Sequence, residues 1–121
     1  MKTILVADDN PVSRELISEI LEAEGYRVIE AIDGGDALQK ARETRPDLVL
    51  LDIQMPVMDG YTVLQELRHD HEFPSIRVVA LTAFAMFGDR EKALAAGFDG
   101  YITKPIKVSA LRAEVEDLLG E

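Results

Sequence analysis

The sequence contains no cysteine, so disulfide bonds and thiolate chemistry are both excluded. It has no apolar run long enough to cross a bilayer. It also begins without a secretory signal, because only a few apolar or small residues separate Lys2 from the acidic pair Asp8-Asp9. From these missing export signals we expect a cytoplasmic protein with no membrane contact.

Basic residues are scarce as well: 13 lysines and arginines stand against 23 acids, for a net charge of -10. Such a chain repels a phosphate backbone, which argues against direct binding to nucleic acid and favours a protein partner or a cation. Nucleotide binding has no support either. The pair Gly34-Gly35 indicates a turn, and the chain has neither a G-x-G-x-x-G nor a Walker pattern.

The overall composition is that of a globular protein. The chain has 121 residues, of which 47% are hydrophobic and 30% charged. That length suffices to bury a hydrophobic core and leaves little room for a second domain. We therefore expect one domain over residues 1–121.

Two hydrophobic periodicities alternate along the chain. Short apolar runs predict strands, and apolar residues three or four apart predict helices. The predicted strands are Thr3–Ala7, Tyr26–Ala31, Asp47–Leu51, Arg77–Leu81 and Asp99–Ile102. The predicted helices are residues 11–24, Asp36–Thr44, Gly60–Arg68, Asp89–Ala96 and Val108–Leu119. Strict alternation predicts a parallel sheet with helices on both faces, and five units are too few to close a barrel.

The first predicted helix and the second predicted strand carry more specific expectations. Val12, Leu16 and Ile20 recur at spacing four, joined by Ile17 and Leu21, and this pattern predicts the buried face of the helix. The strand that follows contains polar residues, which favours a place at an edge of the sheet.

Polar residues stand at the carboxyl ends of four predicted strands. Asp52 follows four consecutive apolar residues, and the other strand ends carry Asp8-Asp9, Thr82-Ala83 and Lys104. Parallel strands place their carboxyl ends at one edge, so these side chains are expected to share a crevice. A capping or turn role is the ordinary interpretation of each residue alone. Their coincidence at four strand ends favours a common site.

The chemistry of this set is that of phosphoryl transfer. Three carboxylates close together repel one another unless a cation lies between them, and oxygen ligands suit Mg²⁺. A hydroxyl from Thr82 and an ammonium from Lys104 are the groups that an incoming phosphoryl group needs. Asp52 is then the nucleophile that forms an aspartyl phosphate.

In order and spacing these residues resemble the receiver domain of two-component response regulators over essentially the whole chain. The matching motifs are Asp8-Asp9, Asp52 with Met55-Pro56-Val57-Met58-Asp59-Gly60, Thr82-Ala83 and Lys104-Pro105. The resemblance implies a flavodoxin-like α/β fold, a five-stranded parallel sheet of order 2-1-3-4-5 with five helices in a three-layer sandwich. It also implies phosphoryl transfer to Asp52 from a histidine kinase or a histidine phosphotransfer protein, in a signalling switch rather than a turnover enzyme.

The resemblance assigns roles around the nucleophile. Asp9 and Asp52 would bind Mg²⁺ through their side chains, Gln54 through its backbone carbonyl, and Asp8 mainly through a water molecule. Gly60 closes the loop motif and is expected to be structural.

The resemblance also implies a switch. The Thr82 hydroxyl would move to a phosphoryl oxygen, helped by the Ala83 backbone, while Tyr101 turns inward. The bond before Pro105 is expected to be cis, which would aim Lys104 into the site. A downstream protein would then bind the face formed by the fourth helix, the fifth strand and the fifth helix.

Two positions are expected to tune the lifetime of the phosphoryl group. Gln54 lies two residues after Asp52, and Phe84 lies two residues after Thr82, where side chains can control access of the hydrolytic water. We expect the bulky Phe84 to slow self-dephosphorylation; packing on the fourth helix is the alternative. The apolar run Ala83–Phe87 either packs in the core or contributes to the output face.

Other functions compete with this one. A hydrolase of the haloacid dehalogenase type also uses an aspartate nucleophile, Mg²⁺, threonine and lysine. That class places its nucleophile after the first strand with a second acid two residues on, where this chain has Asn10. A receiver that serves only as a docking platform is disfavoured because every motif residue is present. The sequence leaves open whether the chain is a stand-alone regulator or a receiver excised from a hybrid kinase.

Overall fold

The computed structural model describes residues 1–70, 75–83 and 86–120. Strands and helices alternate along this part of the chain. The strands are β1 (Thr3–Ala7), β2 (Arg27–Ala31), β3 (Leu48–Asp52), β4 (Arg77–Thr82) and β5 (Gly100–Thr103). The helices are α1 (Pro11–Ala23), α2 (Gly34–Thr44), α3 (Gly60–His69), α4 (Asp89–Ala96) and α5 (Val108–Leu119). None of the described helices has the length and apolar character that a membrane crossing requires.

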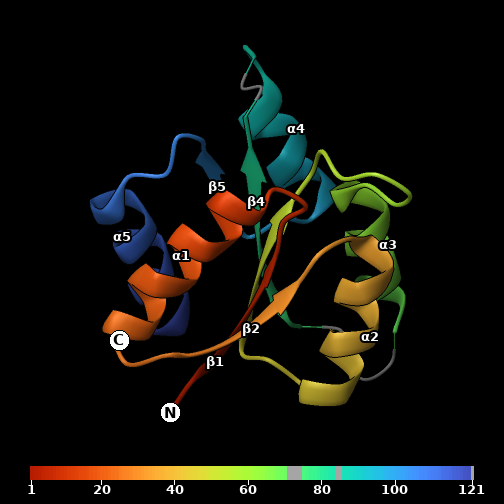
Figure 1. The fold of residues 1–121 in the computed structure, drawn as a ribbon. Helices are drawn as coiled ribbons and strands as arrows, with labels where there is room; N and C mark the ends of the chain where they lie inside the picture. The colour runs from red at the N-terminus through yellow and green to blue at the C-terminus, as the bar shows by residue number, and fades with distance from the viewer. Residues whose placement is uncertain (71–74, 84–85, 121) are drawn as a thin grey trace.

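The strands form one parallel sheet in the order β2-β1-β3-β4-β5. Helices α1 and α5 cover one face, and α2, α3 and α4 cover the other (Figure 1). The predicted three-layer α/β architecture is therefore confirmed, as are the strand order implied by the family resemblance and the edge position of the second strand.

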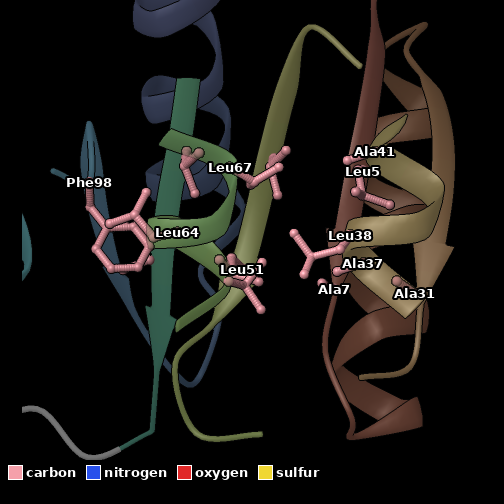
Figure 2. Close-up of a cluster of buried hydrophobic side chains, with 14 of the residues drawn as sticks. Leu5, Ala7, Ala31, Ala37, Leu38, Ala41, Leu51, Leu64, Leu67 and Phe98 are labelled. Carbon is pink, nitrogen blue, oxygen red and sulfur yellow. The ribbon is translucent and has the colours of Figure 1, made fainter. Parts of the chain in front are cut away.

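Each face of the sheet has its own core, because successive side chains of a strand point to opposite faces. Leu5 and Leu51 belong to the cluster beneath α2, α3 and α4, part of which Figure 2 shows. Ile4 and Leu50 belong to the cluster beneath α1 and α5. All four side chains are 0% exposed, so the central strands are rigid supports for whatever their carboxyl ends carry.

The predicted buried face of α1 is partly wrong. Ile17 and Leu21 are fully buried, but Val12 is 74% exposed and Leu16 is 42% exposed. The apolar residues of this helix cover more than one stripe, and a spacing of four fits several phases around its axis. Contact with the sheet selects the phase, and that contact is not visible in the helix sequence.

Element boundaries shift by one or two residues from the predictions. The largest shift is at α2, which begins at Gly34 because the Asp33 side chain accepts a hydrogen bond from the Asp36 N–H at 2.8 Å and caps the helix. Gly34 also packs tightly against the loop after β3, since an added Cβ would lie 2.5 Å from the Met58 carbonyl oxygen. The third and fifth strands each extend one residue further, to Asp52 and Thr103.

Candidate functional site

The carboxyl ends of β1 and β3 bring three acids together. Asp52 is the last residue of β3 and is 3% exposed, and Asp8 follows β1 and is 0% exposed, whereas Asp9 is exposed. Carboxylate oxygens of the three residues all lie within 4.8 Å of one another. The three acids predicted to meet at the strand ends are thus together in the structure.

Lys104, which follows β5, lies between the two buried acids. Its Nζ is 2.8 Å from the Oδ2 of Asp8 and 2.8 Å from the Oδ2 of Asp52. The peptide bond between Lys104 and Pro105 is cis, as the resemblance implied. One ammonium here faces three carboxylates, so the cluster keeps a net negative charge even with its lysine in place.

Asp52 is held at both of its carboxylate oxygens. The Gln54 backbone N–H donates to Oδ1 at 2.8 Å, and Lys104 donates to Oδ2. Burial raises the pKa of Asp52 above its ordinary value, and the neighbouring Asp8 adds to that rise, while Lys104 and the Gln54 N–H oppose it. Burial opposes the charged form of Lys104, but its hydrogen bonds to Asp52 and Asp8 outweigh this and raise its pKa.

Asp8 is positioned by two residues that the sequence analysis did not assign to the site. The Asn10 backbone N–H donates to the Oδ1 of Asp8 at 2.9 Å, while the Asn10 side chain caps α1. The Arg14 guanidinium donates to the Asp8 carbonyl oxygen at 2.8 Å. The Asn-Pro helix start was visible in the sequence, but its link to Asp8 depends on the path of the chain between β1 and α1.

The loop from β3 to α3 passes close behind the nucleophile. A Cβ on Gly60 would lie 2.6 Å from the Ile53 Cα and 2.8 Å from the Asp52 carbonyl oxygen, so only glycine fits there. Val57 has a φ of 69°, and the N–H of Met58 bonds the Pro56 carbonyl oxygen at 2.7 Å. This tight turn puts a β-branched residue in the left-handed region, which is a strained conformation.

Gln54 reaches from this loop to the end of β4. Its Nε2 donates to the Thr82 hydroxyl at 2.8 Å, its Oε1 accepts from the same hydroxyl at 3.1 Å, and the Ala83 N–H lies 3.4 Å from Oε1. The sequence analysis assigned two roles to Gln54: binding Mg²⁺ through its backbone carbonyl and tuning the lifetime of the phosphoryl group. It missed the contact with Thr82, since no pattern in the chain pairs positions 54 and 82.

Tyr101 lies on β5 and is 9% exposed, within the cluster beneath α4. Its hydroxyl is buried and has no hydrogen-bond partner among the residues that the structure describes. Burial raises the pKa of this phenol. Phe84, the second predicted tuning residue, lies outside the described residues. Ala85 also lies outside the described residues, and the described residues of the Ala83–Phe87 run, Ala83, Met86 and Phe87, are all exposed.

The donor set of the crevice fits a hard divalent cation. All three side chains offer carboxylate oxygens, the ligands that Mg²⁺ prefers, and Lys104 leaves part of their negative charge uncompensated. The exposed Asp9 keeps one side of the cluster open to solvent, as a cation that retains part of its hydration shell requires.

Known proteins are similar to this chain in both sequence and fold. Residues 4–116 match the response regulator receiver domain family. A polar-differentiation response regulator, DivK, from Brucella anthropi is 41% identical over 120 residues, which are 99% of this chain and 98% of the relative. DivK from Brucella ovis is 40% identical over the same lengths.

Solved structures are similar over almost the whole chain. The receiver domain of a sensor histidine kinase from Pseudomonas aeruginosa, which has a magnesium ion coordinated in its active-site cleft, is 38% identical with a TM-score of 0.90 and coverage of 99% of this chain and 98% of that one. The chemotaxis protein CheY4 of Vibrio cholerae is 29% identical with a TM-score of 0.90, over 98% of both chains.

Proposed function

The chain belongs to the response regulator receiver domain family, and on that premise we propose that Asp52 accepts the phosphoryl group of a two-component phosphorelay. Receiver domains are signalling switches. The observation that carries the assignment to Asp52 is its position: it is a buried carboxylate that contacts Lys104 and lies beside two further acids. Asp8 is also buried and contacts Lys104, but Asp52 is itself the last residue of a central strand and leads into the Met55–Gly60 motif of the family. The donor is a phosphohistidine on a histidine kinase or phosphotransfer protein.

The reaction is a displacement at phosphorus. A carboxylate oxygen of Asp52 forms a bond to phosphorus as the bond from phosphorus to the donor imidazole nitrogen breaks, and that nitrogen takes up a proton. Lys104 already lies at the Oδ2 of Asp52, where its charge neutralises an incoming phosphoryl oxygen. The Gln54 N–H fixes the carboxylate, so little rearrangement of the nucleophile is needed.

Mg²⁺ is the proposed cofactor. Asp9 and Asp52 would hold it through their side chains, Gln54 through its carbonyl and Asp8 through water. When bound, the ion neutralises charge on the carboxylates and on the transferring phosphoryl group. The receiver domain from Pseudomonas aeruginosa supports this proposal, because it has a magnesium ion coordinated in its active-site cleft.

A substitution of the exposed Asp9 should change Mg²⁺ affinity without reducing the stability of the fold. We expect Asp9→Asn to weaken Mg²⁺ affinity at least about tenfold, the scale of ligand-sphere substitutions at metal sites. In chelator the variant should be at least as stable as the wild type, because a like charge has left the cluster. Thermal unfolding over a Mg²⁺ titration measures both quantities. Asp117→Asn, which removes an exposed acid of α5, is the matched control. An unchanged Mg²⁺ response in Asp9→Asn would contradict the ligand assignment.

The proposed function has a direct chemical test. The wild-type protein is incubated with Mg²⁺ and a small acyl phosphate, and intact-mass spectrometry follows the gain of one phosphoryl group. We expect labelling that chelator prevents and that hydroxylamine removes, since hydroxylamine cleaves acyl phosphates. No labelling under these conditions would reject the proposal.

The output surface is proposed to be the face of α4, β5 and α5. A groove of about 520 Å³ lies there, bordered by Arg90, Tyr101, Lys107 and Glu114. Tyr101 joins this groove to the core beneath α4. Thr82 pairs with Thr103 of β5, which also lines the groove, so a change at Thr82 is one strand away from a surface on which a downstream protein can bind.

This path predicts a long-range response that needs no partner. Beryllofluoride, an analogue of the phosphoryl group, is added with Mg²⁺ while NMR follows the backbone amides. We expect shifts at Ile102 and Ala110, which border the groove, and none at Arg27, at the opposite end of the sheet. Signals confined to the crevice would contradict a role of this face in output.

The remaining proposals are broader. We assign the receiver domain to residues 1–121, which extends the family match by a few residues at each end. A cytoplasmic location follows from the donor, because histidine kinases obtain their phosphoryl group from cytoplasmic ATP. The haloacid dehalogenase alternative has no support, since Asp8, the acid that follows β1 and also contacts Lys104, is followed two residues on by Asn10 and not by a second acid. Self-dephosphorylation controlled at Gln54 and Phe84 remains a prediction.

A further inference from the structure

The side chain of Gln54 closes over the end of β4. Thr82 is 0% exposed, whereas Gln54 itself is exposed, so the carboxamide lies on the solvent side of the hydroxyl. Both heteroatoms of the carboxamide are within hydrogen-bonding distance of the Thr82 Oγ1, at 2.8 Å and 3.1 Å. The Ala83 N–H points to the same Oε1 at 3.4 Å.

The groups that Gln54 engages are the ones that the proposed function requires for another purpose. The Thr82 hydroxyl and the Ala83 N–H are the donors assigned to the phosphoryl group on Asp52. A hydrogen can make one well-aligned hydrogen bond at a time, so a donor directed at Gln54 is not directed at phosphoryl oxygen. The carboxamide must withdraw before these donors can serve the modified aspartate.

We propose that Gln54 is a positioning residue, a latch that holds Thr82 and Ala83 in the unphosphorylated arrangement. This inference rests on the proposed function, because it assumes that Asp52 carries the phosphoryl group. The latch is placed to respond to that event, since the backbone N–H of Gln54 bonds the Oδ1 of Asp52 at 2.8 Å. One residue thus contacts the nucleophile with its backbone and the switch hydroxyl with its side chain.

The latch has a definite thermodynamic consequence. It stabilises only the unphosphorylated arrangement, so it lowers the apparent affinity for any ligand that needs Thr82 released. A neutral hydrogen bond shifts an equilibrium by roughly threefold to tenfold. Removing the carboxamide should therefore tighten the binding of a phosphoryl analogue by about that factor.

Beryllofluoride with Mg²⁺ is the probe, and the Ala83 amide signal in NMR spectra reports its binding. We expect Gln54→Ala and Gln54→Met to bind it roughly threefold to tenfold more tightly than the wild type. Methionine keeps most of the bulk of glutamine without its hydrogen-bonding groups. Gln65→Ala, at an exposed position of α3, is the matched control and should bind as the wild type does. Partial loss of structure does not tighten binding, so the expected gain cannot arise from damage to the fold.

The outcomes separate the latch from the function on which it rests. If the wild type does not bind beryllofluoride with Mg²⁺, the proposed function itself fails. If the wild type binds and both Gln54 variants bind equally well or more weakly, the function stands and the latch is wrong. Tighter binding by Gln54→Ala alone also overturns the latch, because bulk and not hydrogen bonding would then restrain the site.

Discussion

Asp52→Asn is expected to abolish phosphorylation. The amide is nearly the same size as the carboxylate and keeps an oxygen that can accept from the Gln54 N–H, so the loop should hold its shape. The amide lacks the negative charge that makes the carboxylate a nucleophile. With Mg²⁺ and an acyl phosphate, the labelling rate measured by intact-mass spectrometry should fall by at least about three orders of magnitude, a conservative figure for loss of a nucleophile.

The control for this experiment is an acid of the same type outside the crevice. Asp117→Asn should label at the wild-type rate. Labelling of Asp52→Asn at the wild-type rate would move the acceptor to another carboxylate, and peptide mapping after borohydride reduction would identify that residue. The beryllofluoride-induced shifts at the α4, β5 and α5 face should also disappear in Asp52→Asn.

Lys104→Met is expected to be the most destabilising single change at the site in the absence of divalent cations. It leaves Asp8 and Asp52, which are 0% and 3% exposed, without the ammonium that contacts both at 2.8 Å. Leaving a buried charge unpaired costs about 3–5 kcal/mol. That is a large fraction of the stability of an ordinary domain, so urea unfolding in chelator should show a clearly lower midpoint.

A surface lysine provides the comparison. Lys40 pairs with Asp36 at 3.2 Å on the exposed side of α2, and Lys40→Met should cost no more than about 1 kcal/mol. Mg²⁺ should restore part of the stability of Lys104→Met, because a cation at the acids replaces some of the lost positive charge. Equal stability of Lys104→Met and wild type in chelator would mean that the two buried acids do not depend on this lysine.

Much of the site could be predicted because its residues lie at strand ends. A run such as Leu48–Leu51 specifies a buried strand, and the acid after it must then emerge at the carboxyl edge. Parallel alternation sends every such edge to the same side of the sheet. The clustering of Asp8, Asp9 and Asp52 therefore follows from local patterns and one topological rule.

The failures have a common cause as well. The buried face of α1 was misjudged at Val12 and Leu16 because a helix with apolar residues on several stripes does not determine which stripe meets the sheet. The side chain of Gln54 was likewise not predictable, since its partner Thr82 is 28 residues away on a neighbouring strand. The orienting contacts of Asn10 and Arg14 on Asp8 belong to the same class.

By itself the sequence determined the order of the elements and the parallel sheet, and it led to the proposal that Asp52 accepts the phosphoryl group, because hydrophobic periodicity and residue type are local properties of the chain. The tertiary structure alone decided which groups touch. It placed the Lys104 ammonium against two acids at once, and it set the Gln54 carboxamide on the Thr82 hydroxyl. Such contacts depend on distances of a few ångströms between separate strands, and only the packing of helices and strands against one another sets those distances.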